Sequence, residues 1–239
     1  MDKKITQIIS ALKAESIPGE LYIEGSYANG TEDQYSDIDL ALKVDQSAYT
    51  ETTKRISKIL QSLDKPVFIL DYGEDEGFPG FYYFFAIYNS SGSFKIIDLC
   101  ILDITNNHTR GKSKLLHKNS DRIIDTATGN TKSAKSLTKK QKNIVKFYFL
   151  QPGIVKKLIR NEPNQILKET FKLKLLDQIK PFCTQKDLDK INGLIDEHEW
   201  KNAFVRGLKL FNKHTKKYQP HSIDFRNLKK EIEGLSNFF

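Results

Sequence analysis

The spacing of apolar residues changes near residue 136, and that change limits the folds open to this chain. Before it, short runs rich in β-branched and aromatic residues, such as 81–88 and 94–102, are typical of strands. After it, apolar residues recur every three or four positions, as in Ile144, Val145 and Tyr148, which indicates amphipathic helices. Strands followed by helices predict an α+β chain, with a mixed sheet and flanking helices first and an all-α region second.

The first region is expected to begin with a helix over about 3–15, which Pro18-Gly19 ends. A second helix is expected to start with Ser47 as its N-cap and to end near residue 63. The turn at 89–92 makes the strands on either side of it a hairpin. Further strands are expected at 21–23, 37–42, 67–70 and 122–125.

The formal net charge of +8 over 239 residues is divided unevenly. Residues 1–131 hold 14 Lys and Arg against 19 Asp and Glu, a net charge of −5, whereas residues 132–239 hold 24 against 11, a net charge of +13. We therefore predict a domain boundary between residues 131 and 132. The basic region is either a solvated helical surface, which charge alone favours, or a surface for phosphates, RNA or an acidic partner.

Several classes of protein are disfavoured. No apolar run approaches the roughly 18 residues that a membrane span needs, and the first residues lack the apolar block of a signal peptide. Two cysteines, Cys100 and Cys183, provide neither a disulfide framework nor a zinc spacing, and the five histidines show no close ligand spacing. We expect a soluble cytoplasmic protein without membrane contact.

The informative motif is Gly25-Ser26, then Asp37-Ile38-Asp39 after ten intervening residues, with Asp98 alone inside the apolar run 94–102. Alternation along a strand places Asp37 and Asp39 on one face. An ionised carboxylate at Asp98 is costly in an apolar strand unless a cation or hydrogen-bond donors meet it. Mg²⁺ suits such oxygen ligands and takes one or two carboxylates plus substrate phosphates, and two such ions would clamp a phosphoryl transfer.

The motif in residues 25–40, with Asp98, resembles that of the DNA polymerase β-like nucleotidyltransferase superfamily. Within it, the chain is most similar to small stand-alone enzymes such as the aminoglycoside and lincosamide nucleotidyltransferases. The resemblance covers about 20–130, including 122–129. It implies a nucleotidyltransferase catalytic domain at 1–131 and a helical substrate-binding domain at 132–239, with NTP and acceptor meeting in the cleft between them.

By resemblance, Asp37 and Asp39 bind two Mg²⁺ ions, Asp98 binds one of them, and Gly25 and Ser26 hold the triphosphate. The implied reaction moves an NMP, with ATP the favoured donor, to a hydroxyl of a small molecule such as an antibiotic and releases pyrophosphate. Relatives of this kind also suggest an acceptor-orienting acid in the helical region, for which Glu169, Glu197 and Glu199 are candidates, and they allow a homodimer.

Two other functions stay open at this point. The charge of +13 favours a toxin–antitoxin type nucleotidyltransferase that acts on RNA or an acidic protein. The alternative is a basic binding module without catalysis. Trp200, at helical spacing with Phe204, Leu208 and Phe211, is expected in the core rather than at a stacking surface.

Overall fold

The computed structural model describes residues 2–63, 66–75, 78–90, 93–103, 112–119, 138–219 and 229. The chain divides into two compact units, Met1–Gly129 and Asn130–Phe239. The expected strand at 122–125 and the expected boundary at 131 lie outside the described residues. Among those residues, no helix is both long and apolar enough to cross a membrane.

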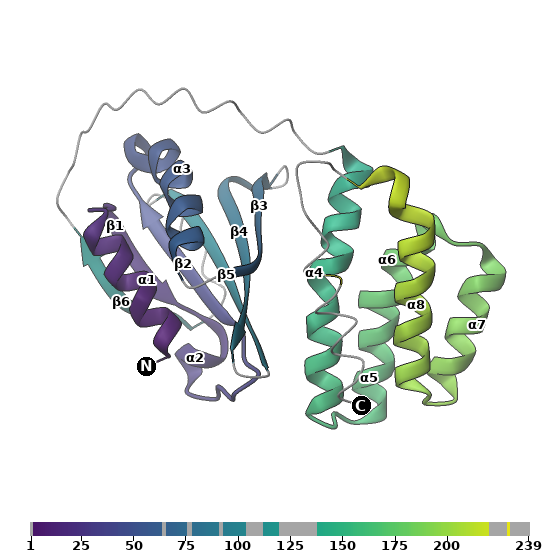
Figure 1. The fold of residues 1–239 in the computed structure, drawn as a ribbon. Coiled ribbons are helices and arrows are strands. Elements are labelled where there is room, and N and C mark those ends of the chain that lie inside the picture. The colour runs from purple at the N-terminus through teal and green to yellow at the C-terminus, as the bar shows by residue number, and fades with distance from the viewer. Residues whose placement is uncertain are drawn as a thin grey trace. The chain divides into compact units, whose positions relative to one another are not determined.

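The first unit is built on one six-stranded mixed sheet, as predicted (Figure 1). Its strands lie in the order β3-β4-β5-β2-β1-β6, and among the described strand pairs only β2 and β5 run parallel. β4 and β5 form the expected antiparallel pair. The strands are β1 (Gly19–Ile23), β2 (Ile38–Val44), β3 (Pro66–Asp75), β4 (Phe78–Ser90), β5 (Ser93–Asp103) and β6 (Lys114–Asn119).

Two helices, α1 (Lys3–Ala14) and α3 (Gln46–Ser62), cover one face of this sheet. Asp2 caps α1, because its carboxylate accepts a hydrogen bond from the Lys4 backbone N–H at 2.8 Å. The expectation that Ser47 caps α3 is wrong: Asp45 occupies the N-cap position and Ser47 is already inside the helix. The apolar faces of both helices pack on the sheet. Ile5 and Leu12 of α1 and Ile56 of α3 belong to one buried core with alternate residues of the central strands, such as Leu40 of β2 and Ile97 of β5.

The second unit is helical, as the spacing predicts. It contains α4 (Lys139–Ile159), α5 (Asn164–Phe171), α6 (Asp177–Ile179), α7 (Gln185–Asp196) and α8 (Trp200–Thr215), with a π-helical turn, Lys172–Leu176, between α5 and α6. Thr138 and Gln141 form a capping box at the start of α4. Aromatic rings fill the interior, where Phe147 stacks on Phe211 at 3.6 Å between ring centroids.

Candidate active site

Two of the predicted carboxylates lie side by side on the sheet. Asp39 of β2 is level with Asp98 of β5 in the parallel ladder, and neighbouring strands lie about 4.8 Å apart. Ile38 and Leu40 pack under the helices, so the alternation along β2 directs Asp39 to the opposite face. Both aspartates are half-buried. The sheet register thus brings together two acids that are far apart in the sequence.

The third predicted acid is placed differently. Asp37 precedes β2, which begins at Ile38, so the expectation of a strand that includes Asp37 is wrong by one residue. Within the described ranges, no three Asp, Glu, His or Cys side chains form a group that could hold a metal ion. The structure therefore pairs Asp39 with Asp98 but does not gather Asp37 with them as a ready three-ligand group, and the metal roles of all three stay a prediction.

The Gly25-Ser26 turn lies directly against Asp39. A short helix, α2 (Gly25–Asn29), starts where β1 ends, and the Glu24 backbone N–H donates to the Asp39 carbonyl at 2.9 Å. Gly25 has a φ of +62°, and a Cβ at this position would lie 2.3 Å from Oδ2 of Asp39. Only glycine fits there, so the turn keeps space at the carboxylate that a side chain would fill.

A half-buried lysine ties the turn to the segment that carries Asp37. Nζ of Lys95 on β5 lies 2.9 Å from the Tyr27 hydroxyl in α2, 3.3 Å from the Ser36 carbonyl and 3.4 Å from the Asp2 carboxylate. These three oxygens match the three N–H donors of an ammonium. Because the Ser36 carbonyl belongs to the peptide group that carries the Asp37 amide, this contact restrains the approach to Asp37. The Tyr27 hydroxyl in turn donates to Asp2 at 3.2 Å.

The charge on this lysine persists over the working range of pH. Burial lowers the pKa of Lys95, but its contacts with Tyr27 and Asp2 outweigh burial and leave the pKa above its ordinary value. Burial also raises the pKa of Tyr27, which keeps the hydroxyl protonated as a donor. The network around Lys95 is a fixed positive contact rather than a pH-sensitive one.

The chemistry of these residues suits a divalent cation. Asp39 and Asp98 supply hard oxygen donors on adjacent strands, and the missing side chain of Gly25 leaves room at Oδ2 of Asp39. Mg²⁺ is usually held by one or two carboxylates while phosphates and water complete its shell. Two protein carboxylates are therefore sufficient as the protein's share of such a site.

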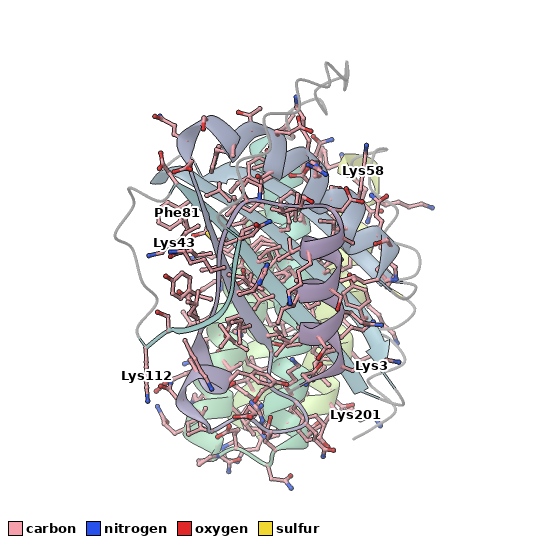
Figure 2. The ribbon with its side chains drawn as sticks, turned by 90° about the vertical axis from the view of Figure 1, so that its left-hand side faces the viewer. Lys3, Lys43, Lys58, Phe81, Lys112 and Lys201 are labelled. Carbon is pink, nitrogen blue, oxygen red and sulfur yellow. The ribbon has the colours of Figure 1, made fainter. Side chains whose placement is uncertain are left out.

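Sequence reasoning missed two residues here. Glu24, immediately before Gly25, is 3% exposed, and Lys95 stands three residues before Asp98. The adjacency of Glu24 to the glycine was a signal available in the sequence. Nothing in the sequence pattern distinguishes Lys95, because its partners come from three separate segments. Figure 2 shows the side chains around this sheet together with the labelled surface lysines Lys3, Lys43 and Lys58.

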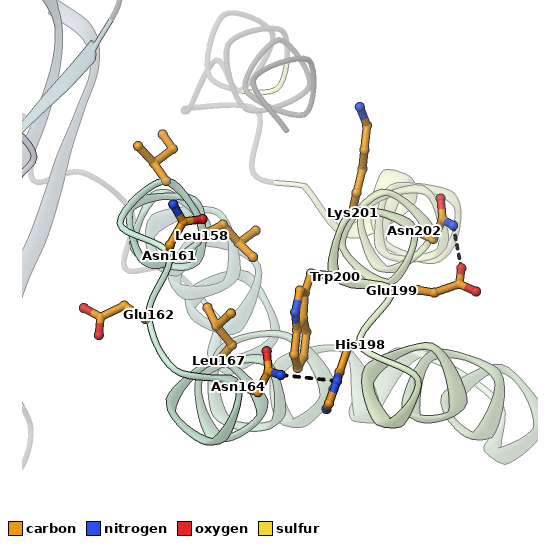
Figure 3. Close-up of a pocket in the computed structure, with 11 residues that line it drawn as sticks. Leu158, Asn161, Glu162, Asn164, Leu167, His198, Glu199, Trp200, Lys201 and Asn202 are labelled. Atoms are coloured by element: carbon orange, nitrogen blue, oxygen red, sulfur yellow. Dashed lines mark hydrogen bonds between the residues drawn. The ribbon is translucent and has the colours of Figure 1, made fainter.

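The helical unit holds a hollow of about 940 Å³ where the end of α4, the start of α5 and the start of α8 meet (Figure 3). Leu158, Leu167 and Trp200 form its apolar wall. Trp200 stacks on His198 at 5.3 Å between ring centroids, and Nδ2 of Asn164 lies 3.3 Å from Nδ1 of His198. The polar lining residues are Asn161, Glu162, Asn164, His198, Glu199, Lys201 and Asn202.

This hollow bears on two expectations. Trp200 was expected in the core, but it is half-exposed and lines the hollow, with its indole against Phe171 at 5.3 Å on the core side. Of the three acids named for the helical region, Glu199 lines the hollow, whereas Glu169 and Glu197 do not. The lining is mostly polar around one apolar wall, and a volume of this order lies within the range of small-molecule sites.

Comparison with known proteins bears on the first unit. Residues 5–79 match the family model of the nucleotidyltransferase domain, a span that includes Gly25, Ser26, Asp37 and Asp39 and ends before Asp98. No curated protein matches the chain. Among solved structures, the crystal structure of an aminoglycoside 6-adenyltransferase from Bacillus subtilis is similar at 15% identity, over 98% of this chain and 96% of that one, with a TM-score of 0.30. A TM-score this low carries no argument about fold or substrate.

Proposed function

We propose that this chain, a nucleotidyltransferase by virtue of its domain at residues 5–79, moves an NMP from Mg²⁺·NTP to a hydroxyl group and releases pyrophosphate. One observation carries the proposal: Asp39 is level with Asp98 while Gly25 lies against the Asp39 carboxylate, inside a nucleotidyltransferase domain. The purely binding role left open by the sequence does not agree with such a domain.

The proposal assigns a task to each residue of the site. Asp39 and Asp98 hold the divalent cation, and Asp37 joins them when the nucleotide is bound. Backbone N–H groups at Gly25 and Ser26, together with the Ser26 hydroxyl, donate to oxygens of the triphosphate. Asp98 also accepts the proton of the attacking hydroxyl. When bound, two Mg²⁺ ions neutralise the charge on the phosphates and align them for in-line displacement.

For the acceptor we propose a small hydroxylated molecule of the antibiotic type, bound in the hollow of the helical unit. The size of the hollow and its indole wall support this choice, with Glu162 and Glu199 at its edge. In Figure 3 both carboxylates point away from the indole, and Glu199 accepts a hydrogen bond from Asn202 at 2.6 Å, so each would have to turn toward a bound acceptor. A carboxylate beside an aromatic face suits a ring that carries hydroxyl or protonated amino groups. ATP is the proposed donor, and the free cysteines Cys100 and Cys183 support a reducing, cytoplasmic setting.

A second acceptor class rests on charge. Residues 132–239 carry a net charge of +13, which would attract RNA or an acidic protein. Binding of RNA would weaken steeply as salt rises, because it releases counterions from the phosphates. A salt titration of binding to labelled tRNA decides this point: salt-independent or absent binding removes RNA as the acceptor.

The reaction is tested by incubating the protein with each labelled NTP, Mg²⁺ and a panel of antibiotics, tRNA and lysate. We expect one acceptor class to become labelled by the wild type, and transfer to fall at least about 10³-fold in Asp39→Ala while the melting temperature is kept. Asp45→Ala is the matched control, since Asp45 is an exposed acid after the same strand. Near-normal transfer by Asp39→Ala would contradict the proposed function.

The acceptor site has its own readout. Trp200 is the only tryptophan in the chain, so its fluorescence reports on the hollow alone. An acceptor identified by labelling should change this emission in a saturable way, and Glu199→Gln should weaken that binding. Saturable labelling without any change in Trp200 emission would show that the acceptor binds outside the hollow.

A further inference from the structure

Glu24 continues the row of acids across three neighbouring strands. It follows β1 with extended backbone (φ −126°, ψ −174°), and its N–H bonds to the Asp39 carbonyl, so it extends the β1–β2 ladder by one residue. Along β1, Ile23 packs in the core under the helices, whereas Tyr22 packs on the other face near Ala41 and Cys100. Alternation therefore puts Glu24 on the face that carries Asp39 and Asp98.

Glu24 is almost wholly buried and has no counter-charge among the described residues. The residue is only 3% exposed, and in the ranges that the structure describes its side chain makes no hydrogen bond and no ion pair. Four residues earlier, on β1 itself, Glu20 shows the ordinary arrangement: it pairs with Lys118 at 2.7 Å and accepts a hydrogen bond from Tyr22 at 2.5 Å. Glu20 therefore has a counter-charge and a hydrogen-bond donor, whereas Glu24 has neither among the described residues.

Such an arrangement costs stability in the metal-free protein. A buried carboxylate loses its hydration and recovers that loss only when a cation or donors approach it. Its nearest neighbours along the row are acids themselves, which adds repulsion rather than relief. A cation that arrives from solution would supply the partner that Glu24 lacks among the described residues.

We propose that Glu24 contributes a further negative charge to the divalent-cation site formed by Asp39 and Asp98, which deepens the function proposed above and rests on it. Because no three acids form a closed ligand group among the described residues, Glu24 acts on the cation through its charge or through a coordinated water rather than as a fixed third ligand. Asp39 then has a carboxylate on each side, from β1 and from β5.

The test compares Glu24→Gln with Glu20→Gln in the full chain. Mn²⁺ is the probe, measured by calorimetry and by its paramagnetic resonance, with and without a non-hydrolysable NTP analogue. Glu24→Gln should raise the melting temperature of the metal-free protein by about 2–4 °C, because it removes an uncompensated charge. The same variant should bind Mn²⁺ about tenfold more weakly. Glu20→Gln should not raise the melting temperature and should keep wild-type Mn²⁺ affinity within twofold.

The two effects of Glu24→Gln have opposite signs, which a structural role would not produce. A lower melting temperature would show that Glu24 has a stabilising partner, and unchanged Mn²⁺ binding would remove it from the cation site; either result overturns the proposal. Failure of the wild type to bind Mn²⁺ at all would instead contradict the proposed function, and retained Mn²⁺ binding by Asp39→Ala would do the same.

Discussion

The two units use their interior polar side chains in different ways. In the helical unit, the buried Thr170 and Thr215 each donate to the carbonyl four residues earlier in their own helix. The longer bonds of this unit join one helical segment to another: Gln151 donates to the Lys174 carbonyl at 3.1 Å, and Tyr148 donates to Asn212. In the sheet unit, Lys95 and Tyr88 reach across to segments far away in the sequence. The distant bonds of the helical unit hold helices to one another, whereas those of Lys95 and Tyr88 fix a loop and a helix end relative to strands. The distant bonds of the sheet unit therefore position the segments that carry the candidate site, and those of the helical unit stabilise its packing.

The two units should differ most in their response to a glycine-to-alanine substitution. Gly25→Ala places a Cβ 2.3 Å from Oδ2 of Asp39 at a φ of +62°, so we expect nucleotidyl transfer to fall about 10²-fold or more. Gly193→Ala, in the middle of α7, meets nothing within 4 Å and should raise the free energy of unfolding by about 0.5–1 kcal/mol. Transfer assays and denaturant titrations check both, and a Gly25→Ala enzyme with normal transfer would show that the turn does not depend on this contact.

A smaller difference is expected when single hydroxyls are removed. Tyr88 donates to the Leu60 carbonyl at 2.7 Å, in the last turn of α3, where the carbonyl has no partner within the helix. Tyr88→Phe should cost about 1–2 kcal/mol in the free energy of unfolding. Thr215→Val should cost less than about 1 kcal/mol, because backbone hydrogen bonding still serves the Phe211 carbonyl. Equal losses in the two variants, measured by urea titration, would break the contrast between distant and local bonds.

The smallest expected effect depends on pH. The hydrogen bond with Lys118, together with that from Tyr22, lowers the pKa of Glu20 below its ordinary value. A lowered pKa in the folded state stabilises the protein above the unfolded pKa, and this contribution is lost as pH falls through the folded pKa. The pair is near the surface, so Glu20→Gln should cost at most about 1 kcal/mol at pH 7 and almost nothing in strong acid. Melting curves at both pH values measure the difference, and a loss that grows in acid would reverse the assigned sign.

Much of the fold could be predicted from the sequence because its apolar spacing is strongly periodic. The helices led by Ile5 and Ile144 and the hairpin of β4 and β5 follow directly from that spacing. β6 was missed because its residues 114–119 are mixed in polarity and only partly buried, so no period-two pattern marks them. Asp45 was missed as the start of α3 because Ser47 offered an equally good capping side chain.

The site was predictable in its residue types but not in its assembly. Asp39 and Asp98 were identified from the apolar strands that surround them. Their position side by side depends on the parallel register of β2 and β5, and no local sequence pattern indicates that register. Glu24 and Lys95 escaped notice because burial and distant partners, rather than a motif, make them significant. Trp200 was misplaced because helical spacing indicates which face a residue occupies but not whether a hollow opens beside it.

The single parallel pair in the sheet has a consequence for how the enzyme matures. β2 and β5 can meet only after α3, β3 and β4, which lie between them in the chain, have been made and folded back. Closing such a long connection is slow compared with forming a hairpin. Asp39 and Asp98 are therefore adjacent only in the finished domain. A nascent chain that ends before β5 has no paired carboxylates with which to hold a nucleotide.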